Sequence, residues 1–174
     1  MYALIDCNNF YVSCERVFQP KWRDKPVIVL SNNDGCVISR SEEAKALGIG
    51  MAVPEFKIRP LLNEHAVGVF SSNYALYGDL SDRLMKLMEQ FTPNVEVYSI
   101  DEAFLDFTGM EVDDFNAYGM QMRSRAWNWL SLPICVGIAP TRVLAKAANR
   151  IAKKYQEKTG GVYVIDTEEK RIKG

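Results

Sequence analysis

The sequence is poor in the side chains that bind structural zinc: it has one histidine, His65, and four cysteines with no C-x-x-C pair among them. Structural zinc sites need several Cys or His ligands at short, regular spacings, so a zinc site is not expected. A disulfide framework is not expected in a chain of this type either, and the cysteines are predicted to be reduced and mostly packed. His65 lies in a predicted exposed connector, and we assign it no role.

Long apolar runs are also lacking. No run approaches the length that would span a bilayer, and the N-terminal segment reaches Asp6 too soon to be a signal peptide. Internal repeats and low-complexity stretches are absent as well. A chain of 174 residues with 48% hydrophobic composition can bury a core and fits one domain, or one domain with a small appendage. We therefore expect a soluble, intracellular protein with no membrane partner.

Net charge is nearly absent, at −1, and by itself gives no sign of a nucleic-acid partner. The charges are unevenly distributed, however. Residues 1–139 contain 12 Lys and Arg against 18 Asp and Glu, whereas residues 140–174 contain 9 against 4. The basic C-terminal part is suited to face phosphate groups, although a charge asymmetry of this size is suggestive only.

Apolar runs bounded by turn residues predict strands, and apolar residues at steps of three or four predict helices. Strands are expected at 2–7, 25–30, 36–39, 95–100, 103–107, 133–138 and 162–165. Helices are expected from residue 10 and at 42–47, 54–62, 74–91, 113–130 and 141–155. Asn73 and Thr141 are expected to cap two of the helices. Buried stripes are expected to include Trp129 in one helix and Leu144, Ala147, Ala148 and Ile151 in another.

The order of these elements predicts the fold class. Without residues 20–70 the order is β, α, β, β, α, β, α, β. The first six elements predict an α+β fold of the ferredoxin-like, split β-α-β type, with a four-stranded antiparallel sheet and helices on one face. Residues 20–70 are then a small α+β insertion after the first strand.

Three acidic residues are predicted to converge in such a sheet. Asp6 ends the first strand, and Asp101 and Glu102 fall in the turn of the central hairpin, whose strands lie beside the first. Neighbouring carboxylates repel unless cations neutralise them, and Mg²⁺ takes oxygen ligands and leaves room for phosphates. Two such ions roughly 3.5–4 Å apart would serve nucleotidyl transfer. The alternative is an ordinary polar turn and a helix cap.

Several ordered motifs resemble those of Y-family, lesion-bypass DNA polymerases. Residues 3–15 (ALIDCNNFYVSCE) are similar to the opening motif of that family, and residues 98–106 (YSIDEAFLD) are similar to its second catalytic motif. Residues 136–149 (VGIAPTRVLAKAAN) match its third motif. Residues 31–38 (SNNDGCVI) and 43–48 (EAKALG) resemble the branch of UmuC, the catalytic subunit of bacterial DNA polymerase V. The resemblance covers almost the whole chain.

The resemblance implies roles for individual residues. Asp6, Asp101 and Glu102 match the catalytic carboxylates, which with the backbone carbonyl of Cys7 would hold two Mg²⁺ ions. Tyr11 matches the steric gate, an aromatic ring under the sugar C2′ that leaves no space for a ribose hydroxyl. The residues that match triphosphate contacts are Asn9, Phe10, Ser39, Lys45 and Lys153, the first two through backbone amides at a helix start. The residues that match the roof over the nascent base pair are Cys36 and Ile38.

One position departs from the family pattern. At Glu42 most members have a tyrosine that bonds the triphosphate. A glutamate there would repel phosphate, so Glu42 must point away or bridge through a metal or Lys45. The basic residues Arg142, Lys146, Arg150 and Lys153 form a stripe on one predicted helix. We expect only its Lys153 end to touch substrate, and the alternative is a solvated basic face.

The resemblance also implies domains and partners. Residues 1–19 and 71–165 match the catalytic palm, residues 20–70 match the fingers, and residues 166–174 match the start of the link to a thumb. The family's thumb and little-finger domains, which grip DNA, are not expected within this chain, so it should polymerise weakly or not at all alone. The implied partners are primer-template DNA, dNTP, the processivity clamp, a UmuD-like dimer and RecA, in the response of bacterial cytoplasm and nucleoid to DNA damage.

Two other functions stay open. A nucleotidyl cyclase of the diguanylate type shares a palm-like sheet, but its hairpin signature is Gly-Gly-Asp/Glu-Glu-Phe, whereas Tyr98, Ser99 and Ile100 precede the acidic pair here. Such cyclases also keep a second acid where this chain has Asn8. The other alternative is a non-catalytic palm relic or partner-binding module, which loss of any of the three carboxylates would favour.

Overall fold

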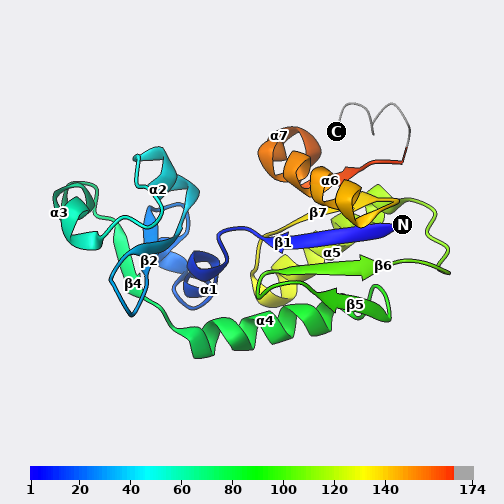
Figure 1. The fold of residues 1–174 in the computed structure, drawn as a ribbon, viewed down its shortest axis with the longest axis horizontal. Helices are drawn as coiled ribbons and strands as arrows, with labels where there is room; N and C mark the ends of the chain where they lie inside the picture. Colours follow the sequence, from blue (N-terminus) through cyan, green and yellow to red (C-terminus); the bar gives the residue numbers. More distant parts are fainter. Residues whose placement is uncertain (167–174) are drawn as a thin grey trace. The chain divides into compact units, whose positions relative to one another are not determined.

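The computed structural model describes residues 1–166, which form two compact units. The three-strand unit comprises Asn9–Gly78, and the five-strand unit comprises Met1–Asn8 and residues 79–166 (Figure 1). The predicted thumb link at 166–174 lies, apart from Asp166, outside the described residues.

The five-strand unit is built on one mixed sheet. Its strand order is β5-β6-β1-β7-β8. The strands are β1 (Tyr2–Cys7), β5 (Asn94–Val97), β6 (Glu102–Asp106), β7 (Ile134–Ala139) and β8 (Val162–Val164). Strand β1 pairs antiparallel with both β6 and β7, and β5 pairs antiparallel with β6. This four-stranded part is the predicted split β-α-β sheet, and β8 extends it by pairing parallel with β7.

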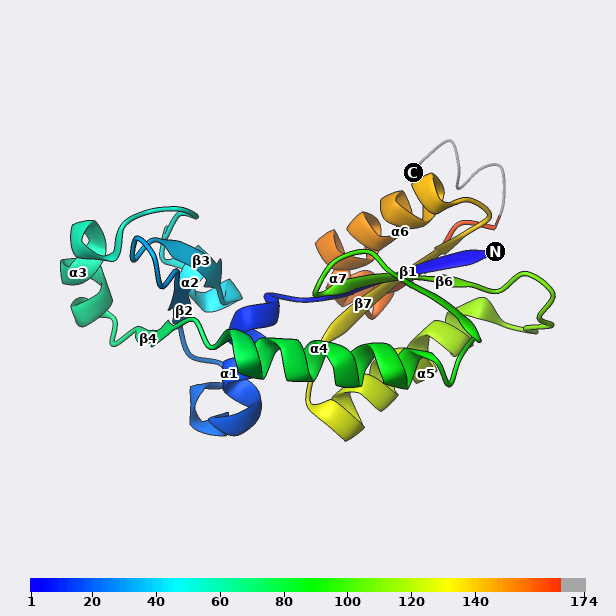
Figure 2. The ribbon, with the colours of Figure 1, turned by 60° about the horizontal axis from the view of Figure 1, so that its bottom comes forward.

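Helices cover both faces of this sheet. Helix α5 (Phe115–Leu130) packs against Ile138 and Val162, because a Cβ on its Gly119 would meet both side chains. Helix α6 (Arg142–Lys154) packs on Leu4, Phe104 and Ala139. Successive strand residues point to opposite faces, so α5 and α6 lie on opposite sides of β7 (Figure 2). The predicted split β-α-β unit includes α5 but not α6, which follows that unit in the sequence and covers the other face.

Two predicted burial stripes need correction. In α6 the buried residues are Ala145, Ala148, Asn149 and Ala152 rather than the larger apolar ones. Small side chains allow the helix axis to come close to the sheet, which pushes Leu144 and Ile151 to the margin of the contact. In α5, Trp129 is 63% exposed and lies with its ring 5.7 Å from the Arg125 guanidinium. Cation–π contact with that guanidinium explains an aromatic ring outside the core.

Helix α4 (Tyr74–Met88) belongs to the three-strand unit up to Gly78 and to the five-strand unit from Asp79. Asn73 caps it as predicted, because Asn73 Oδ1 accepts from the Leu76 amide at 3.1 Å. Thr141 Oγ1 likewise caps α6 by accepting from the Leu144 amide at 3.2 Å. A short helix, α7 (Gln156–Thr159), follows α6 and was not predicted.

The three-strand unit has strand order β3-β2-β4. Strands β2 (Val27–Leu30) and β3 (Val37–Arg40) form the predicted antiparallel hairpin, and β4 (Gly68–Ser71) pairs parallel with β2. Around them lie α1 (Phe10–Phe18), η1 (Pro20–Trp22), α2 (Glu42–Ala46) and α3 (Glu55–Glu64). Strand β4 was not predicted. It starts at Gly68, where a Cβ would lie 2.9 Å from the Trp22 ring, so close packing on Trp22 requires glycine there.

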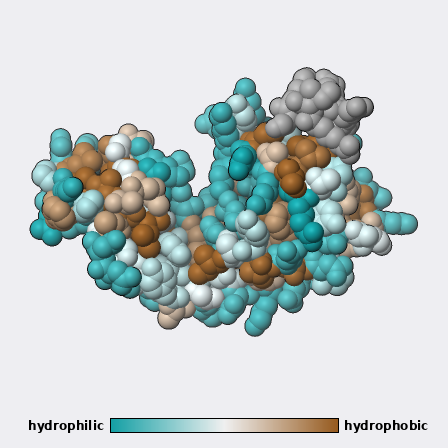
Figure 3. Space-filling model, viewed as in Figure 1, coloured by the Kyte–Doolittle hydropathy of each residue, from teal (hydrophilic) through white to brown (hydrophobic). Residues whose placement is uncertain are grey.

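The surface and the cysteines agree with a globular chain. In the view of Figure 3, hydrophobic residues appear as separate patches among hydrophilic ones. No helix within residues 1–166 is long and apolar enough to cross a membrane. None of the four cysteines, which all lie within residues 1–166, forms a disulfide, and three of them, Cys7, Cys14 and Cys135, are buried.

Candidate active site

The sheet register brings the first and third predicted acids side by side. Asp6 and Glu102 are direct partners across the antiparallel ladder of β1 and β6. The Cys7 amide donates to the Asp101 carbonyl at 2.9 Å, which ties the end of β1 to the acidic turn. Both Asp101 and Glu102 were predicted to lie in the hairpin turn. Asp101 does lie before the strand, but Glu102 is the first residue of β6. The geometry therefore comes from backbone pairing and not from flexible side chains.

Burial controls the charge of Asp6. The residue is 8% exposed, and its carboxylate forms an ion pair with Lys153 Nζ from α6. Burial raises the pKa of Asp6 to about 6; Lys153 opposes this rise, and the charges of Asp101 and Glu102 add to it. Burial disfavours the charged form of Lys153, but the hydrogen bond and charge of Asp6 outweigh it, so the pKa of Lys153 is raised. An additional positive charge near Asp6 would therefore stabilise its ionised carboxylate.

The other two acids share a hydroxyl. Ser99 Oγ lies 2.9 Å from Asp101 Oδ1 and 3.2 Å from Glu102 Oε2, within donating distance of both. In residues 1–166, no three His, Cys, Asp or Glu side chains form a group that could hold a metal ion. The donor chemistry nevertheless fits a hard divalent cation, since three carboxylates adjoin the end of one strand and one of them is buried with a raised pKa.

A cavity of about 240 Å³ adjoins these groups. Its lining residues are Leu4, Asp6, Glu102, Lys146, Asn149, Arg150 and Lys153. The predicted basic stripe of α6 thus turns three of its members, including Arg150, toward the acids. Arg142 instead pairs with Glu96 on β5.

Asn149 is a positioning residue that sequence reasoning missed. Its side-chain amide donates to the backbone carbonyls of Leu4, at 2.9 Å, and Cys135, at 3.1 Å, on two neighbouring strands. The signal in the sequence was a polar residue within an alanine-rich helix face. Gly137 permits this contact, because a Cβ there would lie 2.1 Å from the Asn149 backbone nitrogen. Asn149 and Gly137 therefore fix α6, and with it Lys153, against β1, the strand that carries Asp6.

In the three-strand unit, a second polar group gathers at the start of α1. Lys45 Nζ donates to Asn9 Oδ1 and to Glu42 Oε1, each at 2.9 Å, and Asn9 Nδ2 donates to Glu42 Oε1 at 3.2 Å. The hydrogen bond from Lys45 lowers the pKa of Glu42. Of the two arrangements expected for Glu42, the structure has the bridge through Lys45. Asn9 has φ 46°, in the left-handed region, and Phe10 begins the helix.

The remaining predicted residues of this unit lie on β3, just before it, and on α1. Ser39 is buried, and its hydroxyl accepts from the Val12 amide in the first turn of α1 at 3.4 Å. Cys36 forms an isolated bridge with Pro54, and Ile38 is half-buried. Cys36 directly precedes β3, and the pairing of β3 with β2 is irregular at Ile38, between Val37 and Ser39. Tyr11 stacks on Tyr77 with ring centroids 4.6 Å apart.

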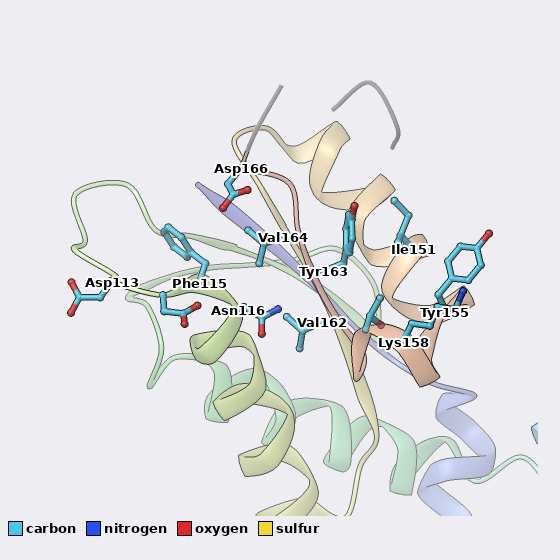
Figure 4. A pocket seen from close by; sticks show the side chains of 12 residues that line it. Asp113, Phe115, Asn116, Ile151, Tyr155, Lys158, Val162, Tyr163, Val164 and Asp166 are labelled. Carbon is cyan, nitrogen blue, oxygen red and sulfur yellow. The ribbon is translucent and has the colours of Figure 1, made fainter. Parts of the chain in front are cut away.

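A larger hollow contains none of the predicted site residues. It measures about 920 Å³ and is lined by residues of β8, the start of α5 and the end of α6 (Figure 4). Its lining includes Phe115, Tyr155, Lys158 and Tyr163. The smaller cavity, by contrast, is lined by three of the predicted site residues, Asp6, Glu102 and Lys153.

Comparison with known proteins agrees with the motifs. The chain is 49% identical over 175 residues to Protein ImpB of Salmonella typhimurium, covering 99% of this chain and 41% of ImpB. It is 50% identical over 163 residues to Protein UmuC of Salmonella typhimurium strain LT2, covering 93% of this chain and 39% of UmuC. The chain therefore spans about two fifths of the length of these relatives.

A solved structure shares the fold. The insertion ternary complex of Dbh DNA polymerase matches with a TM-score of 0.83 and 27% identity, over 97% of this chain and 49% of that one. Residues 5–150 match the impB/mucB/samB family as a whole. Together with the near-complete coverage by relatives such as ImpB and UmuC, this match shows that the chain belongs to the impB/mucB/samB family.

Proposed function

We propose that this chain carries the nucleotidyl-transfer centre of a Y-family, translesion DNA polymerase, which transfers the nucleotidyl group of a template-matched dNTP to a primer 3′-hydroxyl and releases pyrophosphate. The observation that carries this proposal is the buried Asp6, which lies opposite Glu102 in the ladder and beside Lys153. A buried carboxylate with a raised pKa, adjoined by two further acids, is typical of a functional site.

In this proposal Asp6, Asp101 and Glu102, with the Cys7 carbonyl, hold two Mg²⁺ ions. When bound, such ions neutralise triphosphate charge and lower the pKa of an attacking hydroxyl. Lys153 forms an ion pair with the Asp6 carboxylate. If another cation neutralised Asp6, the Lys153 ammonium group would be free to bind a phosphate oxygen instead. In the three-strand unit, Lys45 and the amides of Asn9 and Phe10 bind phosphate oxygens.

The remaining proposed roles are divided between a palm and a fingers region. Residues 1–19 and 71–165 act as palm and residues 20–70 as fingers. Ser39 orders the first turn of α1 through its bond to the Val12 amide and so supports the triphosphate contacts. Tyr11 acts as steric gate, and Cys36 and Ile38 form the roof over the base pair. A roof without bulky side chains suits damaged template bases.

We further propose that DNA, the processivity clamp, a UmuD-like dimer and RecA are partners, in bacterial cytoplasm at the nucleoid. Since phosphate contacts supply most affinity for DNA, and the chain spans about two fifths of its relatives, the 174-residue chain should bind primer-template weakly by itself. Little or no primer extension is expected at about 150 mM salt. Robust extension under these conditions would contradict this part of the proposal.

The test of the catalytic proposal is Mg²⁺-dependent binding of dNTP to the purified chain, measured by calorimetry. We expect binding in the intact chain and loss of binding in Asp101→Ala. Asp79→Ala is the matched control, because Asp79 is an exposed acid that pairs with Arg83 on α4. Equal binding in Asp101→Ala would remove the metal assignment, and no binding in the intact chain would favour a non-catalytic relic.

A further inference from the structure

Three tyrosines and a buried glutamate form one cluster in the three-strand unit. The rings of Tyr11 and Tyr77 stack at 4.6 Å with an interplanar angle of 27°. Tyr74 meets both of them edge-on, at 6.2 Å from Tyr11 and 6.0 Å from Tyr77. Tyr77 is fully buried, and Glu15 is 8% exposed. Tyr11 is thus the half-buried outer member of a stack whose inner member is held in the core.

The inner ring is anchored by a hydrogen bond across the cluster. Tyr77 Oη donates to Glu15 Oε1 at 2.8 Å. Burial raises the pKa of Tyr77, so its hydroxyl keeps its proton and remains a donor. A buried carboxylate needs such a partner, and hydrogen bonds to carboxylates are among the strong ones in proteins. Tyr77 therefore has little freedom to tilt or slide.

The helices reinforce this geometry. Glu15 follows Tyr11 by four residues in α1, so the two side chains lie on the same side of that helix, one turn apart. Tyr77 lies in the first turn of α4, and its amide donates to the Asn73 carbonyl at 3.0 Å. The hydrogen bond between Glu15 and Tyr77 joins the second half of α1 to the first turn of α4, and the Tyr11 ring packs against the Tyr77 ring.

We propose that Glu15 and Tyr77 are positioning residues that hold the Tyr11 ring in the orientation needed to exclude a ribose 2′-hydroxyl. This inference rests on the proposed role of Tyr11 as steric gate. A gate that works by excluded volume depends on ring position, and displacements on the order of 1 Å can change rates by about a hundredfold. The Tyr11 ring stacks on the Tyr77 ring, and the hydrogen bond to Glu15 fixes the position of the Tyr77 ring.

The test compares four conservative variants of the chain. Tyr77→Phe removes only the donor, Glu15→Leu removes the acceptor, and Glu15→Gln keeps an acceptor oxygen. Tyr74→Phe is the matched control, since Tyr74 contacts both rings but is not the donor to Glu15. The main readout is the ratio of Kd values for ATP and dATP, measured with Mg²⁺ at low salt, where DNA binding is strongest, and with excess primer-template whose next base is thymine.

We expect Tyr77→Phe and Glu15→Leu to lower this ratio by at least about threefold, while Glu15→Gln and Tyr74→Phe preserve it. A purely structural role would change both Kd values alike and leave the ratio intact, which would overturn the inference. Tyr11→Ala separates this result from the gate itself. If Tyr11→Ala lowers the ratio and Tyr77→Phe does not, only the positioning role fails; if Tyr11→Ala leaves it unchanged, the gate and the inference both fail.

A second readout needs no nucleotide. 3-Fluorotyrosine placed at position 11 gives one ¹⁹F signal that reports on the surroundings and mobility of that ring. We expect a changed shift and a narrower line in Tyr77→Phe and Glu15→Leu, because the ring loses its fixed backing, and no change in Tyr74→Phe beyond a small ring-current effect. An unchanged signal in Tyr77→Phe and Glu15→Leu would overturn the positioning role regardless of nucleotide affinity.

Discussion

The two compact units hold their candidate site residues by different physical means. In the five-strand unit, Asp6 is buried at the end of a central strand, and the amide of Asn149 ties that strand to its neighbour. In the three-strand unit, the network of Asn9, Glu42 and Lys45 is exposed, with the Glu42 side chain 75% accessible. Backbone register fixes the first group, and exposed side chains fix the second. Substitutions should therefore be costly in the first and mild in the second.

The largest effect is expected for Gly137→Ala, which tests whether the five-strand unit is sensitive to substitution. The added Cβ would lie 2.1 Å from the Asn149 nitrogen and 2.5 Å from the Ala145 carbonyl oxygen. Both atoms belong to the α6 backbone, which would have to move off the sheet. We expect the free energy of unfolding to fall by about 3 kcal/mol or more, measured by urea denaturation.

Gly78→Ala is the control for that substitution. Gly78 lies inside α4, and a Cβ there would have no heavy atom within 4 Å. Alanine is the better helix former by about 1 kcal/mol, so this variant should be unchanged or slightly more stable. A loss comparable to that of Gly137→Ala would show that close helix packing on β7 is not the reason for the larger effect.

The second test concerns the buried charge. The pKa of Asp6 is about 6 in the folded chain against 3.8 for an unperturbed aspartate. The folded state therefore binds the proton more tightly, so the neutral form favours folding at low pH. This contribution is lost as pH rises through about 6, and the difference of about two pKa units corresponds to about 3 kcal/mol.

Asp6→Asn mimics the neutral form at every pH. In EDTA we expect it to be more stable than the native chain by up to about 3 kcal/mol at pH 7, with the advantage vanishing near pH 4. Unfolding free energies at both pH values measure this. Asp79→Asn, at an exposed ion pair, should differ by less than about 1 kcal/mol at either pH. A destabilised Asp6→Asn at pH 7 would mean that the Lys153 pair outweighs burial.

A third test compares the loss of an asparagine side-chain hydrogen-bond donor in the two units. Asn149 donates to two buried carbonyls, whereas Asn32 Nδ2 donates to one exposed carbonyl, that of Ser72, at 2.9 Å. Asn149→Ala leaves buried acceptors without that donor and should cost about 2 kcal/mol of unfolding free energy. Asn32→Ala should cost less than about 1 kcal/mol, because water replaces the donor. Equal losses would contradict the contrast between the units.

The mildest expected effect is that of Glu42→Gln. In this variant Lys45 can still donate to the side-chain oxygen of residue 42, but no carboxylate there competes with the triphosphate for Lys45. The dNTP affinity should therefore rise by about threefold, while the free energy of unfolding changes by less than about 1 kcal/mol. Glu55→Gln is the control, since Glu55 forms a comparable pair with Arg59 in α3. Calorimetric binding measures the affinity, and a weaker affinity in Glu42→Gln would show that Glu42 assists the nucleotide.

Local patterns in the sequence predicted most of the elements. Asn73 and Thr141 mark helix starts because capping is a local interaction, and β2 and β3 flank a turn that can be recognised from Asn33, Asp34 and Gly35. The adjacency of Asp6 and Glu102 followed from topology, because the first strand of a split β-α-β sheet lies beside the central hairpin.

Contacts between distant segments could not be predicted in this way. Glu15 and Tyr77 are 62 residues apart, and Lys153 and Asp6 are 147 apart, so no periodicity connects them. The role of Asn149 was missed because burial of its amide between two carbonyls depends on how α6 approaches the sheet. The four residues of β4 were too few to show a pattern, and a parallel partner strand decided their conformation.

The most direct test of the metal proposal is a crystal of the chain grown with Mn²⁺ and dATP, with anomalous scattering used to locate the metal. The account predicts an anomalous peak bonded to carboxylate oxygens of Asp6 and Asp101, with Lys153 moved from Asp6 to a phosphate oxygen. Bound dATP with no peak at these carboxylates, and Lys153 still paired with Asp6, would contradict it.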